Sequence, residues 1–452
     1  MSKTLAIFAL VLFAFVVLTP NAHAQAPICD VTCTPDPSGS TYAGAVAARP
    51  KLLNARGFSS PIQVTAGPQQ APMVAGSQSY NYVIPILSLP GRAGMDLNLN
   101  LYYNSRVWDI DTINGTATFN ADRDFPSYGF RLDFGYLEYD TINDQYILTE
   151  RDGTKHALPN SGGYNSTDGT YINYNSTSKV LTYKNGTTVL YAPFPTTANL
   201  FRPTQIKDTN GNFISIAYVT GQEQSILAIT DTLNRVINFH YINHQLTSID
   251  QNMASGVHTY ATFTWGTKYG TGVAWNNFSS SLVVSGAPDV NTPLNVLTSC
   301  KYANNTGYSF TYGDWAIINR IDNFSATPTT RSYVSYNYPA ANAGQLTDAP
   351  TYTQQTVSPD GLDTNTSVWT YSATKAGTGV VTAMSVTDPA PISSITVTNL
   401  DPSSGLLSSV QMEDSSGHVL RTISYAWIQS GGANVPGTIT TTLNDTGQQS
   451  SV

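Results

Sequence analysis

Three side chains in one short segment have the types and spacing of a calcium-binding loop. Asp208, Asn210 and Asn212 alternate along the chain, as the first ligands of a helix-loop-helix calcium site do. The glycine stands at 211, before the third of these residues, and the twelfth position is Val219, where such a loop needs a bidentate acid. A turn capped by its own aspartate is therefore the favoured interpretation, with incidental calcium binding at such turns as the alternative.

Histidines offer a second candidate metal site. His240 and His244 stand four residues apart, a spacing that places two ligands together mainly on a helix. The flanking residues follow a strand pattern and supply no acid at the matching register, so we expect no metal site there. The remaining histidines stand alone and are predicted to be ordinary surface or turn residues, at His156, His258 and His418.

Paired carboxylates could hydrolyse a glycosidic bond if they faced one cleft at about 5 to 9 Å. Asp109 and Asp111 form one such pair and Asp122 and Asp124 another. Both pairs lie in polar, turn-like stretches, where acids are usually solvated turn formers. No nucleophile elbow, phosphate-binding glycine loop or Cys/His pair is present. The sequence thus predicts no enzyme and no catalytic, cofactor-binding or metal-binding residues.

The three cysteines carry little chemistry. Cys29 and Cys33 could close a small disulfide in an oxidising compartment, which leaves Cys300 as a single buried thiol. Three cysteines alone cannot complete a structural zinc site, since zinc needs four ligands there.

Composition excludes some partners and points to export. The 452 residues include 21 basic and 29 acidic side chains, for a net charge of −8 without a basic cluster. Nucleic-acid binding requires neutralisation of phosphates, so it is not expected. Charged residues are 11% of the chain while tyrosine contributes 27 residues, a balance typical of exported β-rich proteins.

The first 24 residues read as a secretory signal. Lys3 precedes an uninterrupted apolar run over 5–18, and Ala22-His23-Ala24 forms a small-x-small cleavage site. The run is shorter than the ~20 residues of a membrane span, and no later segment is apolar enough to cross a bilayer. We therefore expect cleavage near Ala24 and a secreted or cell-surface protein. Residues 25–78 are rich in Pro, Gly and Ala and predict a weakly ordered lead-in.

Order is predicted to begin near Tyr80 and to be all-β. Met95, Leu97, Leu99 and Leu101 alternate with polar residues, a period of two that buries one strand face. Two further pairs of alternating runs are separated by dipeptides that favour tight hairpin turns, Asp152-Gly153 and Asn185-Gly186. No amphipathic helix of ten or more residues follows the signal, and residues 79–200 are assigned to an N-terminal β region.

One unit is used repeatedly after residue 200. Residues 206–218 and 229–241 share five identities in thirteen positions at an offset of 23, and their apolar residues have the same phase. A looser copy starts with Asp-Ser-Ser-Gly at 414–417, and another starts at 445–447, where the chain leaves no room for the strand that should follow. The array is therefore assigned to 201–452 and looks truncated at its C-terminus.

These segments resemble the Rhs/YD-repeat proteins, whose tandem β-hairpins wind into a closed shell. The resemblance rests on 88–108, 146–159, the two repeats and 400–427. It covers most of 80–427 except about 267–350, and it is to the divergent N-terminal part of the family. It implies tandem hairpins that wind into an extended or shell-forming sheet. The family's C-terminal core and its variable, often toxic, tip are not recognisable before Val452, so its self-cleavage aspartates have no counterpart here.

The leading hypothesis is an exported, non-enzymatic shell segment whose partners are further repeats or a C-terminal effector region. Ile, Phe and Tyr hairpin residues would hold its wall together. The alternative is a carbohydrate-binding or adhesive module, with cell-surface glycans as partners. It is motivated by Trp108, Trp265, Trp315 and Trp369, for which core packing is the favoured interpretation.

Overall fold

The computed structural model describes residues 79–452 except 112–113, 133, 167–169, 270–273, 289–291, 327–328, 377–380 and 431–432. The predicted signal peptide, the lead-in at 25–78 and the Cys29–Cys33 pair lie outside the described residues. Within them the prediction of an all-β fold without substantial helix is confirmed, because every helix is a single 3-10 turn. These turns are η2 (Arg92–Gly94), η3 (Asn160–Gly162), η4 (Asp314–Ala316) and η5 (Ala341–Ala343). None of them is long and apolar enough to span a bilayer.

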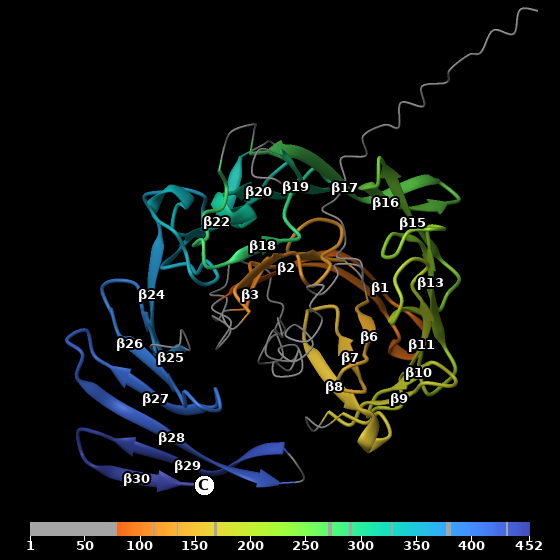
Figure 1. The fold of residues 1–452 in the computed structure, drawn as a ribbon. Helices are drawn as coiled ribbons and strands as arrows, with labels where there is room; N and C mark the ends of the chain where they lie inside the picture. Colours follow the sequence, from red (N-terminus) through yellow and green to blue (C-terminus); the bar gives the residue numbers. More distant parts are fainter. Residues whose placement is uncertain are drawn as a thin grey trace, which may run out of the picture.

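Two small sheets come mainly from the first part of the described chain. The inner sheet consists of β1 (Asn81–Leu89), β2 (Leu97–Asn104) and β5 (Phe130–Arg131), and a second sheet consists of β3 (Trp108–Asp111), β4 (Thr116–Phe119) and β18 (Val283–Ser285). Both lie inside the curve made by the remaining strands (Figure 1).

The remaining strands form one curved wall. Its first part is β6 (Tyr136–Asp140), β7 (Gln145–Thr149), β8 (Lys155–Pro159), β9 (Asn173–Asn175), β10 (Val180–Thr182), β11 (Thr188–Pro193), β12 (Leu200–Lys207), β13 (Phe213–Tyr218), β14 (Ile226–Thr230), β15 (Val236–Ile242), β16 (Gln245–Met253) and β17 (Gly256–Lys268). It continues through β19 (Leu294–Tyr302), β20 (Gly307–Tyr312), β21 (Ile318–Phe324), β22 (Thr330–Asn337), β23 (Gln354–Ser358) and β24 (Ser367–Lys375). It ends with β25 (Val381–Thr387), β26 (Ile395–Leu400), β27 (Leu407–Glu413), β28 (Val419–Ser430), β29 (Ala433–Leu443) and β30 (Gln448–Ser451).

The wall runs without a break across residue 200, where the sequence analysis placed a boundary. β11 pairs with β12 and β12 with β13, all antiparallel, and β6 also pairs with β12. The strand expected to be missing after 445–447 is present: β30 pairs with β29 in register from Leu443 opposite Gln448 to Thr440 opposite Ser451. Four residues were therefore enough to complete that hairpin.

The predicted alternation at 95–101 builds the inner sheet. Leu97, Leu99 and Leu101 are at most 3% exposed and belong to the main core, whereas Asn98 and Asn100 on the opposite face remain accessible. The leucine face covers the wall from β13 to β22, where Ile237 and Phe239 are equally buried. The expectation that apolar hairpin residues hold the wall together is thus confirmed.

Three hairpins in the described part of the wall share one turn, here called the Asp corner: an aspartate at position 1 of five residues, with positive φ at position 4. In each, Oδ1 accepts the backbone N–H groups of positions 3 and 5, Oδ2 contacts the side chain of position 5, and the backbone N–H of position 1 donates to the carbonyl of position 5. The three Asp corners begin at Asp208, Asp231 and Asp414. The two sequence repeats and the third, looser copy therefore share their turn geometry as well as their residue types.

A second shared feature closes the opposite end of the hairpin, here called the strand-end clasp. An aromatic side chain immediately after a β-bulge donates a hydrogen bond to a carbonyl of the preceding strand. The clasps pair Tyr218 with Pro203, Tyr241 with Ile226, Trp265 with Leu246, Tyr312 with Leu297, and Trp427 with Leu407, at 2.6–2.9 Å. Buried phenol and indole groups need such partners.

Candidate functional site

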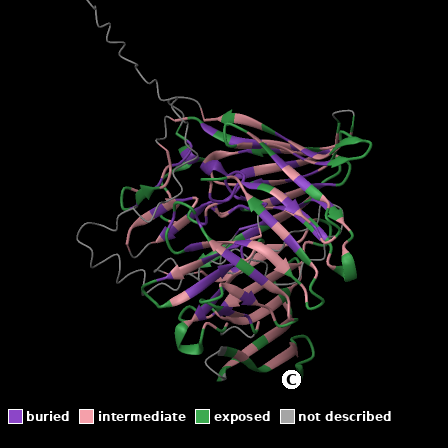
Figure 2. Ribbon diagram, turned by 90° about the vertical axis from the view of Figure 1, so that its right-hand side faces the viewer, coloured by how far each residue is buried: buried purple, intermediate pink, exposed green. Residues whose placement is uncertain are grey.

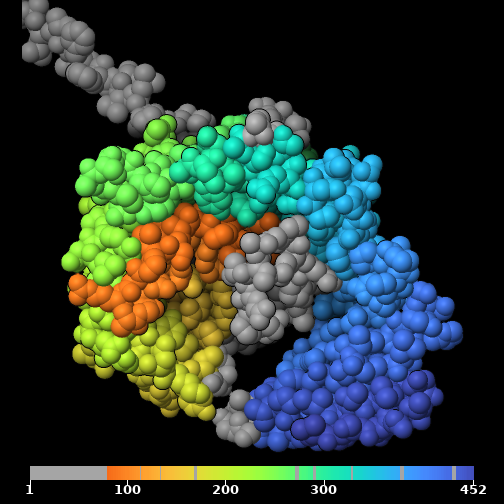
Figure 3. All heavy atoms as spheres, turned by 180° about the vertical axis from the view of Figure 1, so that it is seen from behind, coloured from red at the N-terminus to blue at the C-terminus, as the bar shows by residue number. Residues whose placement is uncertain are grey.

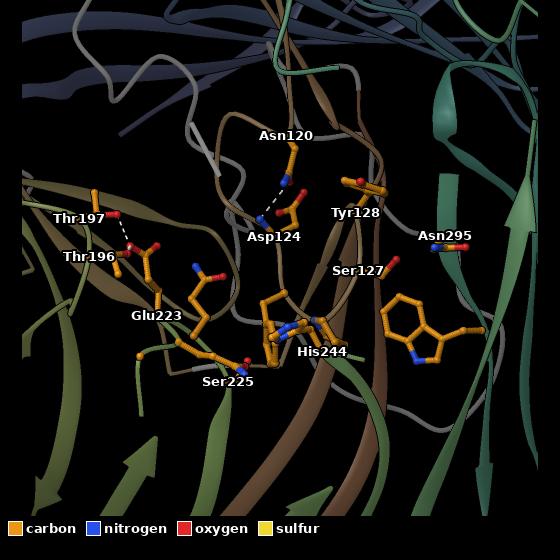
Figure 4. Close-up of a pocket in the computed structure, with 16 residues that line it drawn as sticks. Asn120, Asp124, Ser127, Tyr128, Thr196, Thr197, Glu223, Ser225, His244 and Asn295 are labelled. Carbon is orange, nitrogen blue, oxygen red and sulfur yellow. Dashed lines mark hydrogen bonds between the residues drawn. The ribbon is translucent and has the colours of Figure 1, made fainter. Parts of the chain in front are cut away.

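A polar pocket of about 290 Å³ opens at the rim of the wall that lies opposite the Asp corners. Six parts of the chain meet there: the loop 120–128 after β4, Thr196 and Thr197 before β12, the connection 221–225 between β13 and β14, His244 in the β15–β16 turn, Trp265 near the end of β17, and Asn295 near the start of β19. We call it the rim pocket, and Figure 4 shows its lining. Residues spread over 176 positions, from 120 to 295, thus converge on one cavity.

The loop 120–128 forms the floor and is fixed by buried polar contacts. Gly129 N–H donates to Asp124 Oδ2 at 2.7 Å, and Asp124 N–H donates to Asn120 Oδ1 at 3.0 Å. Ser127 Oγ accepts the N–H of Leu297 in β19 at 3.1 Å. The first two hydrogen bonds therefore fix the loop internally, and the third holds it against the wall.

Glu223 provides a buried carboxylate on one side. Its Oε1 accepts hydrogen bonds from the hydroxyls of Thr196 and Thr197, and the residue is 7% exposed. Its Oε2 lies 3.7 Å from Arg123 Nη1 and accepts no hydrogen bond within the described part of the chain. The guanidinium of Arg202 donates to the carbonyls of Gln222 and Glu223, which fixes the connection that carries this carboxylate.

The opposite side and the mouth are more accessible. In Figure 4, Glu223 and Asn295 lie on opposite sides of the pocket, with His244 between them. His244 and Asn295 are exposed. Trp265 is half-buried, and its Nε1–H donates to Leu246 O as a strand-end clasp. An aromatic ring, amides, hydroxyls and one buried acceptor therefore share a single cavity.

The charges of the rim pocket are compensated. Glu223 lies beside Arg123, and Asp124 lies 3.9 Å from Arg131 Nη2 with its side chain fully buried. No group of three or more His, Cys, Asp or Glu side chains able to hold a metal occurs among the described residues. The arrangement is suited to hydrogen bonding with a neutral ligand.

A second cavity, of about 660 Å³, separates the polar face of the inner sheet from the β7–β8 turn. It shares Glu150 and His156 with a neighbouring cavity of about 400 Å³. Burial raises the pKa of the Glu150 carboxyl above its ordinary value of 4.5, and the hydrogen bond from Tyr183 Oη at 2.9 Å opposes that shift. Raised carboxyl pKa values occur at catalytic sites and in structural networks alike, and the Tyr183 contact places Glu150 in such a network.

The calcium-like segment is an Asp corner. Asp208 accepts Asn210 N–H and Asn212 N–H at 2.8 Å each, and Gly211 takes the left-handed conformation with φ of +85°. The Asn212 amide donates to Asp208 as well, so all three candidate ligands are used within the turn. The interpretation as a turn is confirmed.

The carboxylate pairs differ from the expectation of solvated turn formers. Asp109 and Asp111 lie within strand β3. Asp122 and Asp124 are in a turn-rich loop, as expected, but they are only 6% and 5% exposed. Asp122 forms an ion pair with Lys155 at 2.8 Å, and Asp124 lies beside Arg131. The prediction of solvated acids was wrong for this second pair, since local polarity does not show that the fold brings Lys155 and Arg131 against these carboxylates.

Two expectations about histidines also need correction. His240 does have an acid at the matching register, because Asp250 in β16 lies 2.7 Å from its Nε2. His156, expected at the surface or in a turn, is 8% exposed in strand β8. His244 lies in the turn beyond β15 with φ of +65°, so it shares no strand face with His240. His258 is exposed on β17 and His418 occupies position 5 of an Asp corner.

The tryptophans divide between core and pocket. Trp108 and Trp315 are at most 1% exposed, and both indole N–H groups donate to backbone carbonyls. Trp265 and Trp369 are half-buried, and only Trp265 belongs to the rim pocket. Cys300 is fully buried in β19, and burial raises the pKa of its thiol to about 12, so it is the inert thiol expected.

No protein-family model and no curated protein matches this sequence. Among solved structures, the chain is similar at 9% identity to the TcdB2-TccC3-TEV structure, with a TM-score of 0.21 over 78% of this chain and 22% of that chain. The Tc holotoxin pore of Photorhabdus luminescens gives 12% identity and 0.22 over 66% and 16%. A porin-like protein from Bacteroides uniformis gives 12% and 0.21 over 65% and 94%. The chain thus spans about a fifth of the toxin chains it matches, and TM-scores near 0.2 assign it to no family.

Proposed function

We propose that this chain is an exported scaffold without catalytic activity, whose curved wall forms part of a secreted or cell-surface shell. The observation that carries the proposal is the repetition of one hairpin design along a continuous wall: Asp corners at one rim, strand-end clasps toward the other, and apolar residues on the inward face. Repeats of this kind stabilise one another through their neighbours and build extended surfaces.

Export is part of the proposal and rests on the signal-like first 24 residues. The resemblance to Rhs/YD-repeat proteins suggests the partners: further hairpins of the same kind, or a C-terminal effector region that the shell encloses or displays. The inward face of β26 to β29 supports a role in a larger assembly. Its apolar residues, such as Ile423 and Tyr425, are only half-buried in this chain.

Cysteine labelling of the exported protein tests the proposal. Ile423→Cys places a thiol on the inward face of β28 and Ser424→Cys places one on the outward face, one residue away. Both variants also carry Cys29→Ser and Cys33→Ser, so that the introduced thiol is the one that reacts. Cys300 is kept, because it is buried and unreactive.

In a shell, a bulky maleimide added to the native secreted material labels only the Ser424→Cys variant. In the purified single chain it labels both. Equal labelling of the two variants in the native material would contradict a shell whose inward face is enclosed.

A further inference from the structure

We propose that the rim pocket is a binding site for a neutral, hydroxyl-rich ligand, namely a hexopyranose unit of a glycan, with Trp265 as its stacking platform. The proposal goes beyond the scaffold and does not depend on it, since a wall with or without a shell could carry such a site. It rests on the construction of the pocket, the acceptor left in it, its charge and its aromatic ring.

Most of the pocket lining comes from loops and turns that the wall does not need in order to pair its strands. The connection 219–225 is longer than the β15–β16 turn, and it buries Glu223, Gln224 and Ser225 at 7–8% exposure instead of directing them to solvent. Gln224 Nε2 donates to Arg123 O at 2.9 Å, which joins this connection to the loop 120–128. A rim turn of polar residues normally stays solvated, so this burial gives the cavity fixed walls.

One buried carboxylate oxygen of the pocket lining has no hydrogen-bond donor among the described residues. Glu223 Oε1 is saturated by two threonine hydroxyls, whereas Oε2 accepts no hydrogen bond among the described residues and lies 3.7 Å from Arg123. A buried carboxylate oxygen without a donor is costly. A ligand hydroxyl that donates to Oε2 would remove that cost, and the serine hydroxyls of Ser127 and Ser225 lie on the same lining.

Charge selects against a cation as ligand. Each carboxylate of the lining faces a guanidinium, Glu223 that of Arg123 and Asp124 that of Arg131. A metal ion or amine would compete with these fixed cations and would be repelled by them. A sugar hydroxyl both donates and accepts, so it is compatible with carboxylate, amide and hydroxyl partners together.

The ring of Trp265 supplies the apolar contact that a sugar needs on its C–H face. Its position is set by the clasp to Leu246 and by the β-bulge before it, so the ring is oriented before any ligand arrives. The pocket volume of about 290 Å³ lies at the small end of the range of roughly 300 to 1,000 Å³ for ligand sites. It suits one or two sugar units.

Saturation-transfer NMR on the full mature chain tests the proposal, with D-glucose, D-galactose, D-mannose, lactose and cellobiose as probes at millimolar concentration. We expect saturable transfer to at least one probe, and a loss of affinity of about tenfold or more in Trp265→Ala. Trp427→Ala is the matched control, because Trp427 makes the same clasp, to Leu407, away from this pocket. It should bind within about twofold of wild type, as expected for a remote, independent site.

Two further variants keep the test informative if Trp265→Ala unfolds. Asn295→Ala changes an exposed residue at the mouth and removes one exposed hydrogen bond, from Thr267 Oγ1. Glu223→Gln keeps an oxygen for the threonine hydroxyls while removing the carboxylate. Both should weaken binding, whereas Trp265→Phe, which keeps an aromatic face, should retain most of it.

Three results would overturn the proposal: no saturable transfer to any probe, equal affinity in the Trp265→Ala or Asn295→Ala variant and wild type, or binding of Ca²⁺ or putrescine at this pocket without binding of any sugar. The last result would show that the pocket binds cations through the Glu223 carboxylate, and not sugars through the Trp265 ring and the hydroxyls.

Discussion

Strands β13 to β17 and strands β26 to β29 are built from the same hairpin, but only the first group has a buried face. In the first group Ile237 and Phe239 are 0% and 3% exposed beneath the leucines of the inner sheet. In the second group Ile423 and Tyr425 point to the same side of the wall and are half-buried. Figure 2 shows the same contrast, with buried residues in the upper strands and intermediate or exposed ones beside the C-terminus.

The Asp corners show the same difference. The corner at Asp231 is covered by the β1–β2 connection, since Arg92 N–H donates to Thr232 Oγ1 at 2.8 Å and Arg235 donates to Pro90 O at 2.5 Å. The corner at Asp414 has the same internal hydrogen bonds but remains partly exposed.

Figure 3 shows the cause: the inner sheet, in orange, lies against the green and teal part of the wall and does not extend over the blue C-terminal strands. The hairpin fixes its own turn and clasp locally, whereas burial depends on a separate sheet.

The largest expected difference between the two groups of strands is in the stability lost when a side chain of each is truncated to alanine. Ile237→Ala should lower the free energy of unfolding by about 2 to 5 kcal/mol, because it removes a fully buried side chain from a packed core. Ile423→Ala should cost about 1 kcal/mol or less, since its side chain is half-accessible already. Urea denaturation of the two variants measures both values. Equal losses would show that the C-terminal strands have a packed core of their own.

A smaller effect is expected from the corner aspartates. Asp231→Ala should cost about 2 to 3 kcal/mol, because the carboxylate is buried, accepts three hydrogen bonds and neutralises Arg235. Asp414→Ala should cost clearly less, since its corner is open to solvent. Thermal unfolding of the two single variants, with Asp231→Asn as a control that keeps the turn-forming side-chain oxygen, tests the difference. If Asp414→Ala lowers the free energy of unfolding as much as Asp231→Ala does, the β1–β2 connection that covers the Asp231 corner adds nothing to its stability.

The smallest expected effect concerns the pKa values of the turn aspartates, which depend on local hydrogen bonds in both groups of strands. Hydrogen bonds within the turn lower the pKa of Asp208, through the Asn212 side chain, and that of Asp414, through His418 N–H, below the ordinary 3.8; at Asp401, through the Ser403 hydroxyl, the pKa falls to about 2.

A carboxyl whose pKa is lower in the folded state contributes stability above its ordinary pKa, and that contribution is lost as pH falls through the folded pKa. Carboxyl ¹³C titration by NMR should therefore find all three midpoints below 3.8, in the covered and the uncovered wall alike. A midpoint at or above 3.8 for Asp414 alone would show that its corner does not form in solution.

Local patterns in the sequence predicted the local structure well. The alternation at Leu97, Leu99 and Leu101, the hairpin dipeptides and the repeated Asp corners depend on neighbours within a few residues, and these features appear in the structure. The shared phase of Ile214-Ile216-Tyr218 and Ile237-Phe239-Tyr241 likewise predicted which face of the wall is buried.

Long-range features could not be predicted in this way. Nothing near Leu99 indicates that its partners lie on β13 to β22, and the polarity of Asp122 and Asp124 gave no sign of Lys155 and Arg131. The rim pocket was missed for the same reason, since its lining extends from Asn120 to Asn295. The one available signal was Trp265, which looked like the other three candidate tryptophans in the sequence until burial separated them.

The position of the inner sheet also sets an order of events during synthesis. Its anchors reach far along the chain: Tyr80, directly before β1, donates to the carbonyl of Ile318, 238 residues later, and Tyr103 Oη in β2 accepts the N–H of Ile318, 215 residues later. At about 5 to 20 residues per second, those partners are made roughly 10 to 50 s after the inner strands. The inner sheet is therefore made first but covered late, and its leucine face needs protection from aggregation during that interval.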